Sequence, residues 1–228
     1  MAFEGFPQSG LAFLRDLAQH NDRDWFEAHR TAWDEGIVPA MLAWCSDLQE
    51  RLRDVMPRLT FVPRVGGSLY RLVRDIRFSK DKRPYKLHVA ALLWEGGTEK
   101  QEAPGVYVHV SPHEVIFGGG LYVFEEGRLD RYRKLLHHPQ AAARLQAALA
   151  TAKKGGLNLD GEKLVKPPRG FDPEGTFAEL SKHKGLVVVK STKPAGWLHS
   201  KEALDRSEAV ARAYAPLHAW MRDELCKI

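Results

Sequence analysis

The sequence has very little cysteine and no long apolar run. Among its 228 residues only Cys45 and Cys226 are cysteines, too few and too far apart to predict a disulfide framework or a CxxC metal pattern. No stretch approaches the about 18 apolar residues that a membrane span needs, and the first residues lack the basic region and apolar run of a signal peptide. We therefore expect free thiols, a cytoplasmic location and no membrane partner.

The signature motifs of nucleotide-binding and metal-binding enzymes are also missing. Gly66 and Gly67 precede a β-prone run, whereas the glycine loop of a phosphate site precedes a helix, and there is no HExxH pattern. Cys45 lies on the apolar face of an expected helix, which favours a core position over a nucleophile. The sequence therefore predicts no particular reaction or cofactor, and it leaves the oligomeric state open.

What is present is the composition of an ordinary globular protein, with 44% hydrophobic and 28% charged residues. Apolar residues at helical spacing predict helices within residues 11–57, at about 129–137 and 140–153, and from about residue 200 onward. Pro216 interrupts the last of these patterns, and we expect it to kink or break that helix.

Strands are predicted where apolar residues alternate with polar ones or form short dense runs. Short turns between such runs favour antiparallel pairing. We therefore predict one α+β domain over residues 1–228, with a mostly antiparallel sheet packed by N-terminal and C-terminal helices. The strands are expected at residues 68–73, 87–94, 106–110 and 115–117, and near residue 188.

The most unusual stretch is residues 71–86, RLVRDIRFSKDKRPYK, which we call the basic loop. It carries seven basic and two acidic side chains, so its net charge of +5 equals that of the whole chain. Such a density of like charge needs solvent, carboxylates from elsewhere in the chain, or an anionic ligand. We predict that the ligand-binding residues are Arg71, Arg74, Arg77, Ser79, Lys80, Lys82, Tyr85 and Lys86.

These residue types suit a phosphate-bearing ligand, either a phosphorylated small molecule or nucleic acid. Arginine offers paired donors to phosphate, lysine a point charge, and Tyr85 or Phe78 an aromatic ring that stacks on a base or sugar. The alternatives are a solvated hairpin whose charges pair with carboxylates such as Glu27 or Glu102, and a surface that binds an acidic protein.

Two further groups are expected as possible contributors. Trp25, His29 and Arg30 share one helix, with Trp25 and His29 on the same face, where the histidine either extends the site or packs. Asp75 and Asp81 would serve a metal-assisted hydrolase of a phosphorylated substrate. We favour a different role for the two aspartates, in which salt bridges orient basic side chains and lower the aspartate pKa values.

Histidines and glycines also occur in or next to the expected strands. If the strands of His88 and His109 are neighbours, the two rings can face each other, and Glu114 is then the nearest third ligand for a metal. We favour hydrogen-bonded or exposed strand histidines and predict no metal site. Residues 118–120, three glycines, indicate a bulge or a close approach of strands, with substrate access as the alternative.

Several phrases of the sequence resemble one family. They are Phe3-x-x-Phe6-Pro7, LAFLRDLAQHNDRDWFEAHR, GGSLYRLVRDIRFSKDKRPYK, PGVYVHVSPHEVIFGGGLY and LVKPPRGFDPEG. In this order they are similar to the DUF2461 family of conserved hypothetical proteins. The resemblance implies a soluble, mostly bacterial α+β domain with no agreed activity and no catalytic residues to carry over. Small departures from its pattern are His20-Asn21, where paired asparagines are usual, and Thr176-Phe177, where a short aliphatic pair is expected.

Overall fold

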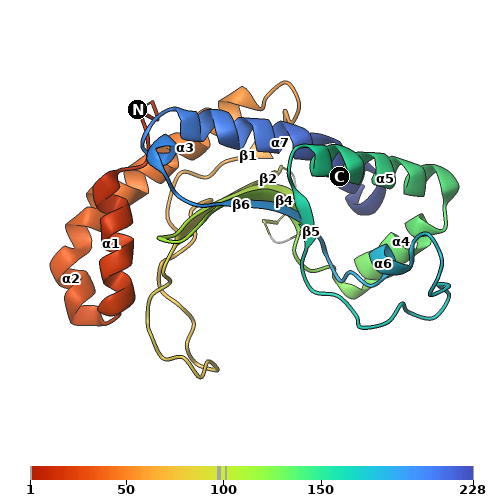
Figure 1. The fold of residues 1–228 in the computed structure, drawn as a ribbon, viewed down its shortest axis with the longest axis horizontal. Helices are drawn as coiled ribbons and strands as arrows, with labels where there is room; N and C mark the ends of the chain where they lie inside the picture. The colour runs from red at the N-terminus through yellow and green to blue at the C-terminus, as the bar shows by residue number, and fades with distance from the viewer. Residues whose placement is uncertain (1, 97–98, 101, 228) are drawn as a thin grey trace. The chain divides into compact units, whose positions relative to one another are not determined.

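The computed structural model describes residues 2–96, 99–100 and 102–227, which form helices and one six-stranded sheet (Figure 1). The strand order is β1-β2-β3-β4-β6-β5 and the sheet is antiparallel, so the predicted α+β class is confirmed. The strands are β1 (Leu59–Thr60), β2 (Val89–Glu95), β3 (Gly105–Val110), β4 (Val115–Leu121), β5 (Asn158–Asp160) and β6 (Leu186–Thr192). The α-helices are α1 (Gln8–Gln19), α2 (Arg23–Thr31), α3 (Val38–Arg51), α4 (Glu126–Leu136), α5 (Pro139–Lys154), α6 (Ala178–Ser181) and α7 (Glu202–Trp220).

Shorter helical turns complete these elements. A π-helical stretch, Ala32–Ile37, joins α2 to α3, a 3-10 turn spans Gly196–His199, and a second π-helical stretch, Met221–Cys226, follows α7. Pro216 lies inside α7, which continues to Trp220, so the helix does not break at this residue, and the kink that we expected as the other outcome stays a prediction. Because Pro216 is exposed, water can replace the backbone donor that proline lacks.

The chain divides into two compact units, and the single-domain expectation stays a prediction. The first unit comprises residues 1–93, 107–117 and 191–208, and the second comprises residues 94–106, 118–190 and 209–228. Each unit has its own buried aromatic and aliphatic side chains, and each is described by itself below.

The first unit is built around aromatic packing of its helices. Phe13 of α1 contacts Trp25 and Phe26 of α2, with ring centroids 5.5 and 6.3 Å apart. Trp44 of α3 is fully buried and meets Phe117 of β4 edge-on at 5.8 Å. These contacts give α1 to α3 the apolar cover that their sequence pattern requires.

The second unit depends on a close approach of β4 and β6. A Cβ atom on Gly118 would lie 2.3 Å from the carbonyl oxygen of Val188, and one on Gly120 would lie 2.0 Å from that of Leu186. The prediction that residues 118–120 serve a close strand approach is therefore confirmed. On the helical side, the indole N–H of Trp220 donates to the carbonyl of Ala141, which ties the end of α7 to α5.

Candidate anion-binding site

The basic loop forms the far end of an irregular hairpin that extends from the sheet (Figure 1). Its arms touch through two isolated bridges, Leu69 with Ala91 and Val73 with Tyr85. The predicted strand at residues 68–73 is therefore wrong. The two bridges are four residues apart on the first arm and six on the second, so no continuous ladder of hydrogen bonds can form between them.

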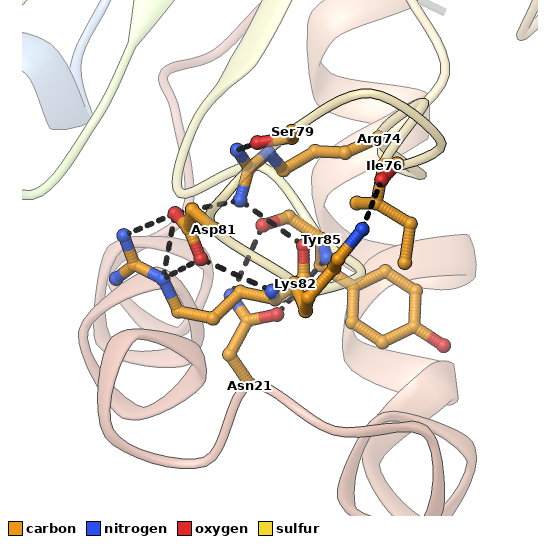
Figure 2. Close-up of polar contacts among 8 residues, drawn as sticks. Asn21, Arg74, Ile76, Ser79, Asp81, Lys82 and Tyr85 are labelled. Carbon is orange, nitrogen blue, oxygen red and sulfur yellow. Dashed lines mark hydrogen bonds and ion pairs between the residues drawn. The ribbon is translucent and has the colours of Figure 1, made fainter.

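A side-chain amide fixes the base of the basic loop to the corner between α1 and α2. The Asn21 amide nitrogen donates to the carbonyl of Tyr85 at 3.0 Å, and the Tyr85 N–H donates back to the Asn21 oxygen at 2.9 Å (Figure 2). The Tyr85 ring stacks on Phe26 with centroids 4.5 Å apart and is only 7% exposed. Tyr85 is therefore an anchor of the hairpin, and its ring is not available to stack on a ligand.

Two short clamps of the same design lie within the loop. In each, an aspartate accepts hydrogen bonds from the backbone and the guanidinium of the arginine two residues later. The Asp75 carboxylate lies 2.7 Å from Nη2 of Arg77, and the Asp81 carboxylate lies 2.7 Å from Nη2 of Arg83. These hydrogen bonds hold the pKa values of Asp75 and Asp81 below the usual range. The interpretation that the two aspartates orient basic side chains is confirmed.

Arg74 braces the loop from the inside. Its Nη1 donates to Asp81 at 2.8 Å and to the carbonyl of Arg83 at 3.1 Å, and its Nη2 lies 3.5 Å from the hydroxyl of Ser79 (Figure 2). Lys82 adds a bond from Nζ to the carbonyl of Ile76 at 3.1 Å. Arg74 and Ser79, both predicted as ligand-binding residues, therefore help to build the loop.

Four of the predicted cations are not held by any carboxylate that the structure describes. Among the described residues, Arg71 and Lys80 form no hydrogen bond or ion pair, and Lys82 bonds only to the carbonyl of Ile76. Lys86 is half-buried with its Nζ 5.6 Å from the centre of the Tyr70 ring, and burial lowers its pKa. The two loop carboxylates offset two of seven basic groups, so the net charge of +5 remains.

The other expected contributors have partners of their own. His29 stacks on Trp25 at 4.1 Å, and Arg30 pairs with Glu27 at 3.3 Å and with Asp34 at 2.9 Å. Across the described part of the chain, no hydrogen bond or ion pair joins Trp25, His29 or Arg30 to the basic loop. Glu27 pairs with Arg30 of its own helix. Among the described residues no ion pair joins Glu27 to a cation of the basic loop, so it is not the partner that one alternative expected.

A cluster of four rings lies beside Lys86: His88, His109, Tyr107 and Tyr70. The expectation that the rings of His88 and His109 can face each other is confirmed, but the sequence did not predict the two tyrosines beside them. The rings of His88 and His109 stack at 4.2 Å, and His109 is 3.1 Å from the hydroxyl of Tyr107, which meets Tyr70 edge-on. Burial lowers the pKa of each histidine to about 4, so both are neutral near pH 7. The alternation of residues 106–110 was the signal for one face of β3, but only the fold brings Tyr70 to it.

Glu114, the nearest candidate for a third metal ligand, forms a hydrogen bond elsewhere. The Glu114 carboxylate accepts a hydrogen bond from the hydroxyl of Ser191 at 2.7 Å. Within residues 2–96, 99–100 and 102–227, no three histidine, cysteine or acidic side chains gather in a way that could hold a metal ion.

Replacing Asp81 by asparagine should loosen the loop, because Arg74 and Arg83 both lose their carboxylate. Limited trypsin digestion followed by mass spectrometry should then show severalfold faster cleavage after Lys80 and Lys82. Asp75→Asn is the matched control, since it makes the same change of charge but leaves the brace of Arg74 intact. Equal cleavage rates in wild type and both variants would contradict the bracing role.

Comparison with known proteins places the chain in a family. Residues 9–220 match the family described as Conserved hypothetical protein (DUF2461). The protein therefore belongs to the DUF2461 family, as its sequence phrases indicated. No curated protein and no solved structure matches the chain. In the part of the chain that the structure describes, no helix combines the length and apolar character needed to cross a membrane.

Proposed function

We propose that this protein binds a phosphate-bearing or other anionic ligand through the basic loop. The observation that carries the proposal is the charge that remains after every acid of the loop has been used. Both aspartates are committed to Arg74, Arg77 and Arg83, yet a net charge of +5 persists on 16 consecutive residues. A ligand with negative charge is the simplest compensation for such a field.

The structure of the loop favours binding for a second reason. A loop braced by its own hydrogen bonds loses little further entropy when a ligand binds, so more of the interaction energy appears as affinity. The cations that face a ligand in this proposal are Arg71, Lys80, Lys82 and Lys86. Lys86 is partly removed from water, which strengthens its attraction for an anion.

The test is calorimetric titration with inorganic polyphosphate at low salt. Replacing Lys80, Lys82 and Lys86 together by alanine should weaken binding about tenfold or more, and the loss should shrink as salt is added. The matched control replaces three exposed lysines outside the loop, Lys153, Lys154 and Lys166, with the same change in net charge. If the two triple variants bind polyphosphate equally well, the loop is not the site.

The two alternatives make different demands on the loop. A metal-assisted hydrolase needs free carboxylates, whereas Asp75 and Asp81 are occupied by arginines and have lowered pKa values that make them weak bases. An acidic protein partner would use the same cations as a phosphate ligand. That alternative predicts that the wild type captures an acidic protein and has no affinity for polyphosphate.

We further propose a cytoplasmic location for this function. Cys45 and Cys226 are both free thiols, which suits a reducing compartment.

A further inference from the structure

The tip of the basic loop presents an aromatic ring to water. Phe78 is 94% exposed, and it lies within a turn in which the Ser79 N–H donates to the carbonyl of Ile76 at 3.3 Å. A phenylalanine side chain gains free energy from burial, and this one forgoes nearly all of it. The other aromatic ring considered for stacking, Tyr85, is buried against Phe26, so Phe78 is the ring that remains for a ligand.

The surroundings of Phe78 are cationic. The Arg77 guanidinium lies 5.8 Å from the centre of the ring and is held by its clamp to Asp75. Lys80 and Lys82, both exposed, follow within four residues. An aromatic ring between basic side chains is the arrangement by which proteins bind single-stranded nucleic acid, in which bases stack on the ring and phosphates meet the cations.

We propose that the ligand of the basic loop is single-stranded nucleic acid and that Phe78 stacks on one of its bases. This inference rests on the proposed function, because the cations supply the phosphate contacts. In duplex DNA the bases are already stacked, so a ring at a loop tip reaches them only by unstacking a step. A single strand offers both groups without that cost.

An anionic membrane surface fits the tip less well. Interfacial binding needs a broad apolar face, whereas the residues that flank Phe78 within positions 75–81 are charged or polar except Ile76, and they include the carboxylates of Asp75 and Asp81. Among the described residues of the loop, Val73 is the other exposed large apolar side chain, and its bridge to Tyr85 places it at the base of the loop.

The test compares two proteins with two probes by fluorescence anisotropy. The probes are a labelled oligothymidylate of about 16 nucleotides and an abasic strand of the same length, which keeps the phosphates and lacks the bases. Wild type should bind the oligothymidylate about tenfold more tightly than the abasic strand. Phe78→Ala should remove this preference and leave binding of the abasic strand unchanged.

Two further variants sharpen the comparison. Phe78→Trp should keep the preference, because tryptophan also stacks on bases. Val165→Ala, at a side chain 90% exposed and far from the loop in sequence, should leave both affinities unchanged.

The failures of the two proposals are distinguishable. Equal binding of the two strands by wild type, with polyphosphate binding still dependent on Lys80, Lys82 and Lys86, would overturn the stacking role and leave anion binding intact. The stacking role is also overturned, with anion binding intact, if wild type binds anionic vesicles and Phe78→Ala abolishes that binding. If wild type binds neither the oligothymidylate, nor the abasic strand, nor polyphosphate, both proposals are overturned.

Discussion

Gly120→Ala should lower the free energy of unfolding by about 3 kcal/mol or more. Gly120 has φ of +136°, a conformation that residues with a side chain rarely adopt, and its Cβ position lies 2.0 Å from the carbonyl oxygen of Leu186 and 2.8 Å from Cα of Val187. Both obstacles are backbone atoms of β6, so no side chain can rotate away to make room. The strands must separate or the variant must unfold.

Chemical denaturation followed by circular dichroism measures this loss. Gly127→Ala is the matched control, because Gly127 lies in the first turn of α4 with open space around its Cβ position. That change should be neutral or stabilising by up to about 1 kcal/mol, since alanine favours helix more than glycine does. Similar stabilities for the two variants would show that β4 and β6 do not approach as closely as described.

His218→Met should cost about 3 kcal/mol of folding free energy at neutral pH. His218 and Glu95 are both buried, with His218 Nε2 3.3 Å from a Glu95 carboxylate oxygen. Methionine fills a similar volume but offers no polar group to the carboxylate. The variant therefore leaves the buried Glu95 carboxyl group with one polar partner fewer.

The wild type should lose stability in acid because of this histidine. Burial, followed by the charge of Arg222, lowers the pKa of His218 to about 4 from an ordinary value of 6.5. As pH falls below about 6.5, His218 takes up a proton in the unfolded chain but not in the folded one. The free energy of unfolding therefore falls until pH reaches about 4. The loss from this group is at most about 3 kcal/mol.

Urea denaturation of both proteins at about pH 7.5 and about pH 5 tests this pair of expectations. The difference in stability between wild type and His218→Met should be largest at the higher pH. A difference that stays constant or grows toward acid would show that the pKa of His218 is not lowered in the folded protein. His88 and His109, whose pKa values are lowered in the same direction, contribute to both proteins alike.

Local patterns were sufficient for most of the secondary structure. The alternation around residues 106–110 and the apolar run before residue 95 correspond to β3 and β2, and the three glycines at 118–120 correspond to a close strand contact. The strand predicted at residues 68–73 failed because its composition favours β structure but its partner arm has extra residues. Pairing register depends on both arms, and one arm alone does not contain it.

The basic residues of the sequence located the candidate site, and the side-chain contacts in the structure show how its charges are arranged. Counting basic residues was enough to single out the basic loop. The count could not show that Asp75 and Asp81 close onto Arg77 and Arg83, although an arginine two residues after each aspartate is a signal that can be sought in other sequences.

The sequence by itself determined the α+β class, the family, and the position of an excess of positive charge, because periodicity, characteristic phrases and charge are properties of residues close together in the chain. Only the tertiary structure decided which side chains are free to meet a ligand. Tyr85 and Phe78 are equally aromatic in the sequence, but Asn21 and Phe26, about 60 residues away, bury the first and leave the second in water. Burial depends on contacts between distant segments, and those exist only once the chain has folded.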